Sequence, residues 1–294
     1  MIYLIDASVF VFRAWFSIPS SMTGRDGSPV NAAYGFARFL GDFLSQARPG
    51  YVAVAFDESL TTSFRNEIFP GYKVNRELPP PELKSQFRDC REITAALGLA
   101  DFADPRFEAD DIIGTIAARM RSAGRSCVVV SRDKDLAQLL RADDEYWNYI
   151  DRRRFGYSDI AENFGAIPER MPDYQALVGD KVDNIPGVPG VGPKTATTLM
   201  QEFASLEDLF DTLERVQRLP IRGATGIAKR LEQHRDAAFL ARRLTRIETT
   251  MPLELDEDRL VTTRPDLKNL FSIYDRLGFG AGVRRQAQQL TDSF

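Results

Sequence analysis

Short apolar runs alternate with segments of helical periodicity over residues 1–175. The runs IYLID, YVAVAF and SCVVVS have the continuous apolar character of buried strands, whereas NAAYGFARFLGDFLSQA and EADDIIGTIAARM have the spacing of amphipathic helices. Asn31 is placed to cap the first of these helices. Strands that alternate with helices form a mostly parallel sheet with helices on its faces. The sequence therefore predicts an α/β domain over residues 1–175.

The alternation is interrupted after residue 58 and changes again near residue 176. Residues 59–81 mix aromatic, basic and proline residues without a period, before PELKSQFRDCREITAALG resumes a helical pattern that ends at Gly98. A loop of this length inside a compact domain is usually functional or disordered. From residue 176 to 294 we predict a helical region, in which GVPGVGPKTATTLMQEF is a tight hairpin followed by a helix with Pro193 in its first turn.

Composition excludes several classes of protein. The chain has 294 residues and a hydrophobic content of 44%, enough for a substantial core, and no apolar stretch approaches the length of a membrane helix. Its two cysteines give no disulfide framework and suit the reducing cytoplasm. The single histidine, His234, lies in a polar stretch and supports neither a Ser-His-Asp triad nor a zinc site.

Nine carboxylates occupy similar positions in this pattern, because each follows a strand, begins a helix or precedes a glycine turn. They are Asp6, Asp57, Glu108, Asp110, Asp111, Asp133, Asp135, Asp180 and Asp183. The carboxyl ends of parallel strands share one edge, so we expect these acids to converge there. Any one of them alone could be a helix cap or a surface acid. Together they repel one another, and divalent cations would compensate that repulsion.

An all-oxygen ligand set favours Mg²⁺ or Mn²⁺ over zinc or copper. Two such ions about 4 Å apart can activate water and stabilise the leaving oxygen of a phosphodiester, which removes the need for a histidine base. Removing the nine acids from the 42 acidic residues leaves 33, against 38 basic ones. The rest of the surface could therefore attract a phosphate backbone in spite of the net charge of -4.

Two further segments have the composition of nucleic-acid contacts. The loop at 59–81 interleaves stacking groups with cations, as single-strand binding requires; these residues are Phe64, Arg65, Tyr72, Lys73 and Arg76. The glycine hairpin can expose backbone N–H groups to a phosphate through Gly187, Gly190 and Gly192, with Lys194 at the start of the next helix.

One family is resembled by the segments LIDAS, FDESLTTSFRNEIFPGYKVNR, FEADDIIGTIA, SRDKDLAQLL, LVGDKVDNIPGVPGVGPKTA and RGATGIAKRLEQ. This is the 5′ nuclease, or flap endonuclease, superfamily, and the chain is most similar to the 5′-3′ exonuclease domain of bacterial DNA polymerase I. The resemblance covers nearly the whole chain. It implies a PIN-like sheet, a helical arch near residues 59–97 and a helix-three-turn-helix motif within residues 176–294.

The resemblance also implies roles for single residues. One metal ion would be held mainly by Asp57, Glu108, Asp110 and Asp111, and the other mainly by Asp180 and Asp183, with Asp133 and Asp135 between them and Asp6 outside. The expected catalytic residues are Lys73, Arg76, Asp110 and Asp133. The expected DNA contacts are Arg13, Phe64, Arg65, Tyr72, Lys73, Arg76, Gly187, Gly190, Gly192 and Lys194. Backbone carbonyls would hold K⁺ at Leu177, Val178, Pro186, Val188 and Val191.

These features predict a stand-alone, monomeric cytoplasmic nuclease with no membrane partner. It would use two or more Mg²⁺ or Mn²⁺ ions to cut DNA at a 5′ flap or a junction of single strand and duplex, as a 5′-3′ exonuclease and flap endonuclease in primer removal and repair. One alternative is a DNA-binding module that has lost turnover, which the complete acidic set disfavours. The other is a PIN-like ribonuclease, which the glycine hairpin and the arch segment disfavour. The balance of exonuclease and endonuclease activity, and the preference for DNA or RNA, stay open.

Overall fold

The computed structural model describes residues 1–58 and 61–291. Residues 59–60, at the start of the expected arch segment, and 292–294, at the end of the expected helical region, lie outside the described residues. The chain forms two compact units that are interleaved in sequence. The first unit comprises Met1–Glu58, Leu78–Arg132 and Thr249–Phe294, and the second comprises Ser59–Glu77 and Asp133–Glu248. Each unit is described by itself.

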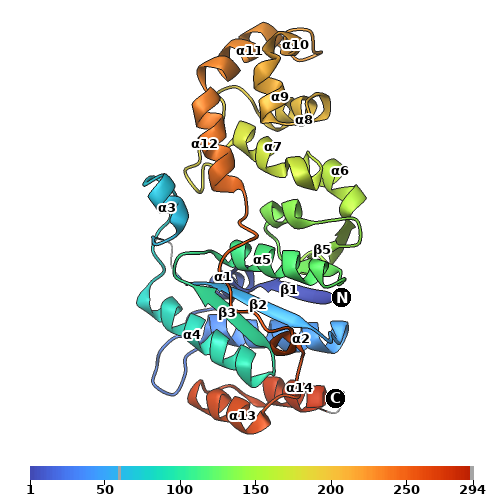
Figure 1. Ribbon diagram of the computed structural model, residues 1–294. Helices are drawn as coiled ribbons and strands as arrows, with labels where there is room; N and C mark the ends of the chain where they lie inside the picture. Colours follow the sequence, from blue (N-terminus) through green and yellow to red (C-terminus); the bar gives the residue numbers. More distant parts are fainter. Residues whose placement is uncertain (59–60, 292–294) are drawn as a thin grey trace. The chain divides into compact units, whose positions relative to one another are not determined.

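The first unit contains parallel strands in the order β3-β2-β1-β4. These are β1 (Ile2–Asp6), β2 (Val52–Asp57), β3 (Ala100–Asp104) and β4 (Cys127–Val130). Strands β1 and β4 pair in parallel, as do β1 with β2 and β2 with β3. Most of their side chains are buried, as expected of strands covered on both faces. The predicted mostly parallel sheet is therefore confirmed (Figure 1).

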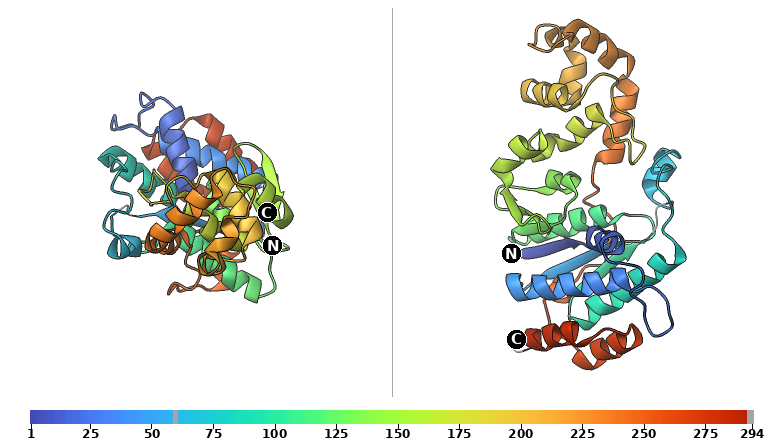
Figure 2. Two further views of the ribbon diagram at one scale, coloured as in Figure 1. Left: turned by 90° about the horizontal axis from the view of Figure 1, so that it is seen from above. Right: turned by 180° about the vertical axis from the view of Figure 1, so that it is seen from behind.

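Helices cover both faces of this sheet. The helices of the first unit are α1 (Ala7–Ser17), α2 (Asn31–Ala47), α4 (Pro81–Ala96), α5 (Ala109–Ser122), the 3₁₀ helix η4 (Glu257–Leu260), α13 (Leu267–Arg276) and α14 (Ala281–Thr291). Helix α5 packs on β1, β2 and β3 from one side, and α2 and α4 lie on the other (Figure 1). Outside them, α13 packs on α4 and α14 packs on α2 (Figure 2).

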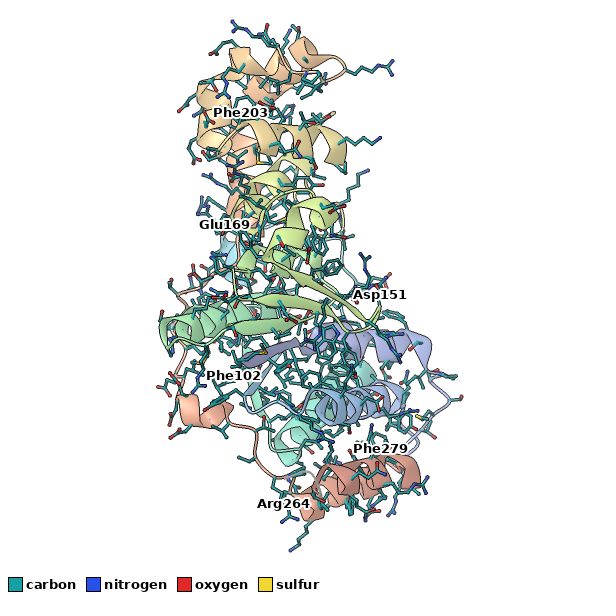
Figure 3. All side chains as sticks on the ribbon, turned by 90° about the vertical axis from the view of Figure 1, so that its right-hand side faces the viewer. Phe102, Asp151, Glu169, Phe203, Arg264 and Phe279 are labelled. Atoms are coloured by element: carbon teal, nitrogen blue, oxygen red, sulfur yellow. The ribbon has the colours of Figure 1, made fainter. Side chains whose placement is uncertain are left out.

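Aromatic side chains fill the first unit where helices meet the sheet and one another. Phe36 of α2 lies 5.7 Å from Phe56 of β2, measured between ring centroids, and both are buried. Phe279, labelled in Figure 3, contacts Tyr34 of α2 and Tyr274 of α13 at 5.3 and 5.4 Å. These contacts fix α2 against the sheet and the C-terminal segment around Phe279 against α2.

The second unit is mainly helical. Its elements are α3 (Phe64–Ile68), η1 (Lys134–Leu139), β5 (Glu145–Asn148), β6 (Arg153–Gly156), η2 (Tyr157–Asp159), α6 (Ile160–Phe164), η3 (Pro168–Arg170), α7 (Met171–Val178), α8 (Pro193–Glu202), α9 (Leu206–Asp211), α10 (Leu213–Val216), α11 (Ala224–Gln233) and α12 (Arg235–Thr245). Strands β5 and β6 form an antiparallel hairpin. Helix α7 packs between α8 and α12, and α10 packs on α11. The predicted helix after the glycine hairpin is α8, with Pro193 at its first position.

Two local predictions need correction. Asn31 is not a cap but the first residue of α2, and its side-chain amide donates to the carbonyls of Trp15 and Ile18 at 3.0 and 2.9 Å. The aperiodic loop contains α3, a short helix capped by the side chain of Ser63. Within residues 1–58 and 61–291, no helix is both long enough and apolar enough to span a bilayer.

Candidate catalytic and nucleic-acid sites

The first unit places acids at the carboxyl ends of neighbouring strands. Asp6 ends β1 and Asp57 ends β2, and the strand register sets Asp57 opposite Asp104, the last residue of β3. Asp6 is 4% exposed, and its Oδ2 accepts a hydrogen bond of 2.8 Å from Ser131, which follows β4. The expected strand-end positions of Asp6 and Asp57 are therefore confirmed, and the convergence of the acids stays a prediction.

Three more predicted ligands lie where α5 begins. Glu108 is its N-cap and accepts from the backbone N–H of Asp111, whose own carboxylate accepts from the Glu108 N–H at 3.0 Å. Asp57 Oδ1 accepts from the N–H of Ala109 at 2.9 Å. The first turn of a helix has N–H groups without helical partners and a partial positive charge, so it favours carboxylates. Asp57 is thereby tied to the same helix start as Glu108, Asp110 and Asp111.

The second unit contributes the other four acids through two turns. Asp133 caps η1 by accepting from the N–H of Asp135 at 2.9 Å. Asp180 Oδ1 accepts from the N–H groups of Val182 and Asp183 at 2.7 and 3.3 Å, and its backbone pairs with Ile185. Short turns closed by their own Asp side chains are common where a chain reverses direction. Here they fix the positions of both acid pairs.

Asp135 carries the clearest electrostatic signature of this group. Its pKa is raised to about 7, chiefly by burial and also by the charges of Asp133, Asp180 and Asp183, while Lys134 acts to lower it. Its Oδ1 is buried and has no hydrogen-bond partner among the described residues. A carboxylate that is costly to ionise and lacks a donor is stabilised by a cation.

Cations of the expected arch segment meet the same acidic turn. Arg76 Nε donates to Asp183 Oδ1 at 2.6 Å, and the backbone N–H of Lys73 donates to the carbonyl of Asp183 at 2.9 Å. The Asn184 side chain donates to the carbonyl of Gly71 at 2.8 Å. Burial raises the pKa of Asp183, although Lys73 and Arg76 act to lower it. The expected catalytic residues Lys73 and Arg76 thus lie beside Asp183, an expected metal ligand.

Two residues expected to contact DNA are interior instead. Arg65 is 2% exposed, and its guanidinium donates to the carbonyls of Leu244 and Arg246 at 2.8 and 3.0 Å. Tyr72 is 4% exposed and lies under the ammonium of Lys73. Their burial does not fit direct stacking on a nucleic acid, and both residues stabilise the base of the arch segment. Phe64 is half-buried, whereas Arg13 is exposed on α1.

The glycine hairpin borders a cavity of about 520 Å³ whose lining includes residues 178–181, residues 184–191, Phe69 and Asn75. A Cβ on Gly187 would come within 2.3 Å of the Val178 carbonyl oxygen, and Gly190 has φ +78, so both positions require glycine. A Cβ on Gly192 would meet nothing within 4 Å. Lys194 is exposed in the first turn of α8.

The expected K⁺ ligands lie near this hairpin. Val178, Pro186, Val188 and Val191 line the cavity, whereas Leu177 does not. The carbonyls of Leu177 and Val188 already accept backbone hydrogen bonds of 2.9 and 3.0 Å. Carbonyl oxygens can accept more than one partner, so the K⁺ site stays a prediction.

No three Asp, Glu, His or Cys side chains form a ready-made metal site within the part of the chain that the structure describes. Most of the nine carboxylates instead accept backbone hydrogen bonds in caps and turns. The donor chemistry nevertheless fits hard divalent cations, since every predicted ligand supplies oxygen. The partnerless buried oxygen of Asp135 fits them as well. The division of the nine acids between ions stays a prediction.

Three residues that the sequence pattern did not single out lie beside the predicted metal ligands. Ser131 binds Asp6, and Asp104 ends β3 beside Asp57. Gln138 is buried; its amide donates to the carbonyls of Asp135 and Thr245, both at 3.0 Å, and its Oε1 accepts from the N–H of Ile247 at 3.0 Å. Ser131 and Asp104 share the strand-end position that identified the other acids. Nothing in the sequence marks Gln138.

Sequence comparison finds relatives of similar length and relatives that are much longer. A 5′-3′ exonuclease of Aquifex aeolicus is 36% identical over 269 residues, which cover 92% of this chain and 89% of that protein. The DNA polymerase I of Rhizobium leguminosarum is 37% identical over 294 residues, which cover 98% of this chain and 28% of the polymerase. The DNA polymerase I of Pseudomonas aeruginosa is 39% identical over 94% of this chain and 30% of its own length. The chain thus spans under a third of these polymerases.

Solved structures share the fold at lower identity. The 5′-exonuclease of phage T5 with bound zinc aligns with a TM-score of 0.65 at 20% identity, covering 99% of this chain and 98% of that one. The catalytic core of Rad2 with DNA substrate aligns with a TM-score of 0.64 at 15% identity, covering 98% and 90%. The family model of the 5′-3′ exonuclease N-terminal resolvase-like domain matches residues 1–165, and that of the C-terminal SAM fold matches residues 166–268. The chain belongs to the 5′-3′ exonuclease family.

Proposed function

We propose that this chain is a divalent-metal-dependent, structure-specific 5′ nuclease that hydrolyses DNA phosphodiesters near junctions of single strand and duplex. It acts as a 5′-3′ exonuclease and flap endonuclease in primer removal and repair. The observation that carries this proposal is the contact of Lys73 and Arg76 with the Asp183 turn, in the unit that also holds the buried carboxylate of Asp135. Phosphoryl transfer requires both acids that bind metal and cations that stabilise developing negative charge.

Two of the similar structures support this proposal because they contain DNA. One of them is a phage T5 flap endonuclease in a pseudo-enzyme-product complex with DNA and metal ions, and Rad2 was solved with DNA substrate. The polymerase activity of the longer relatives is not part of the proposal, because the chain matches only 28% and 30% of the two compared above.

In this proposal each unit holds one ion. Asp57, Glu108, Asp110 and Asp111 would bind the first, with Asp6 behind them, and Asp133, Asp135, Asp180 and Asp183 would bind the second. Mg²⁺ or Mn²⁺, when bound, would supply an activated water and neutralise the leaving oxygen.

In this proposal the chain's own cations and backbone amides bind the phosphate groups of the DNA. Lys73 and Arg76 place positive charge where the phosphate accumulates negative charge. The glycine hairpin and Lys194 bind duplex phosphates. K⁺ at the hairpin, a monomeric state and a cytoplasmic location are predictions that complete the proposal.

The test measures cleavage of 5′-labelled flap, nicked and blunt DNA with and without Mg²⁺. The parent chain should cut flap and nicked DNA only with Mg²⁺. Asp110→Asn and Asp133→Asn, one from each unit, should each reduce the single-turnover rate by orders of magnitude, because metal positioning is lost. DNA binding in EDTA should persist or tighten, because negative charge is removed.

Asp143→Asn is the matched control, since Asp143 is an exposed acid of the second unit with no assigned chemistry. It should cut at the parent rate. Equal loss of binding and cleavage in Asp110→Asn and Asp133→Asn would refute the catalytic assignment. Cleavage of single-stranded RNA in preference to flap DNA would favour the ribonuclease alternative.

A further inference from the structure

The loop before α11 and the helix itself are rich in cations. Residues 215–230 include Arg215, Arg218, Arg222, Lys229 and Arg230 and contain no Asp or Glu, although the whole chain has a net charge of -4. Arg215 pairs with Asp208 at 3.4 Å. The other four form no ion pair with any carboxylate of the described residues. We call Arg218, Arg222, Lys229 and Arg230 the α11 basic patch.

Arg230 connects this patch to the glycine hairpin. A Cβ on Gly190 would lie 2.9 Å from Arg230 Nε, and a Cβ on Gly226 would lie 3.4 Å from its Nη1. The guanidinium therefore packs directly on the backbone of the hairpin. Its Nε is buried and has no hydrogen-bond partner among the described residues. The α11 basic patch is accordingly in direct contact with the glycine hairpin through Arg230.

The backbone beside the patch is open. Gly223 precedes α11 with φ +75, and a Cβ there would meet nothing within 4 Å. Arg218, Arg222 and Lys229 are exposed. A polyanion can bind such cations without first breaking protein ion pairs, and it gains entropy from released counterions. Guanidinium groups also match the geometry of phosphate oxygens.

We infer that the α11 basic patch is a second phosphate-binding surface, which contacts the backbone of the same DNA duplex that the glycine hairpin binds. The inference rests on the proposed function, because it assumes a DNA substrate. Contacts of this kind hold the duplex in register without reading its sequence. The patch should therefore contribute to affinity and leave the chemical step unchanged.

The test compares two double variants by DNA binding in EDTA across a salt titration. In the variant that combines Arg222→Ala and Lys229→Ala, the magnitude of the slope of log K against log salt should fall by about two, and affinity at moderate salt should fall about tenfold. The single-turnover cleavage rate at saturating flap DNA should equal that of the parent. The control combines Arg38→Ala and Arg285→Ala, exposed arginines of the first unit that form no ion pair among the described residues. It should keep the parent slope.

Two outcomes would overturn the inference: an unchanged slope in the patch variant, or an equal loss in both double variants, which would indicate general electrostatics. The thermal midpoint is measured for every variant. If the alanine pair unfolds, Arg222→Gln with Lys229→Gln replaces it, and the same slopes decide. A patch variant that loses slope while the parent chain fails to cut any DNA would reject the proposed nuclease and retain the binding surface.

Discussion

At the scale of single residues, Asn184 both shapes the turn after Asp183 and binds the arch segment. Its backbone has φ +55, a left-handed conformation, and its side chain holds Gly71 of the arch segment. We expect Asn184→Ala to be less stable than Asn184→Gly by about 1 kcal/mol, because alanine is strained at positive φ while glycine is not. Both variants lose the hydrogen bond to Gly71. Urea unfolding of the two variants beside the parent measures the difference, and equal stability would show that the turn relaxes.

The sequence predicted the acids better than it predicted the residues around them. Asp6 and Asp57 each follow directly on an apolar run, so the strand pattern places both at the carboxyl ends of strands. Arg65 was expected to bind DNA, since an arginine in an aperiodic loop resembles a solvent-exposed cation. Its burial depends on carbonyls of residues 244 and 246, and no local pattern reveals a contact across that sequence distance.

At the scale of elements, three helices of the second unit are joined by one arginine. Arg242 of α12 donates to Glu207 of α9 at 2.8 Å, and it pairs with Asp173 of α7 at 3.3 Å. The hydrogen bonds from Arg242 lower the pKa of Glu207 to about 2, from an ordinary value of 4.5. A carboxyl with a depressed folded-state pKa adds stability above its unfolded pKa and loses it as pH falls through the folded pKa.

We therefore expect Glu207→Gln to be less stable than the parent at pH 6, with a difference that shrinks below about pH 4.5 and vanishes near pH 2. Denaturant unfolding of both proteins across this pH range measures it. Because Glu207 is partly exposed, added salt should reduce the difference. A gap between the two proteins that does not change with pH would assign the effect to packing instead of charge.

The elements were largely predictable where hydrophobic periodicity was strong. Strands β1, β2 and β4 and the helices α2, α4, α5 and α8 follow from apolar spacing, proline and glycine signals. Helix α3 was missed because it has only five residues and depends on the cap at Ser63 and on long-range contacts of Arg65. Short helices are stabilised by tertiary packing, which a local window does not contain.

At the scale of the whole molecule, the nine acids divide between two compact units. Calorimetric titration with Mn²⁺ should show two bound ions in the parent. Asp57→Asn with Glu108→Gln should lose one ion, and Asp180→Asn with Asp183→Asn should lose the other, because each pair replaces two anionic carboxylates of one group with neutral amides. Loss of both ions in either double variant would contradict the assignment of one ion to each unit.

The sequence indicated an α/β region followed by a helical one, and the family models divide the chain in the same order, at residues 165 and 166. It did not indicate that Thr249–Phe294 joins the first unit, or that Ser59–Glu77 joins the second. Such pairings depend on contacts between distant segments, such as α14 with α2 and Arg76 with Asp183. Hydrophobic periodicity shows which side of a helix or strand is buried, but it does not show which distant segment packs against that side.

The interleaving of the units has a consequence for synthesis on the ribosome. The chain passes between the units after Glu58, Glu77, Arg132 and Glu248, and α13 and α14 emerge after every element of the second unit. Until they do, the outer sides of α2 and α4 lack the helices that pack on them. The first unit therefore completes its fold only after the last segment of the second unit, which ends at Glu248, has been synthesised. A nascent chain stalled between Glu248 and α13 would carry the acids of both units while the outer sides of α2 and α4 are still uncovered.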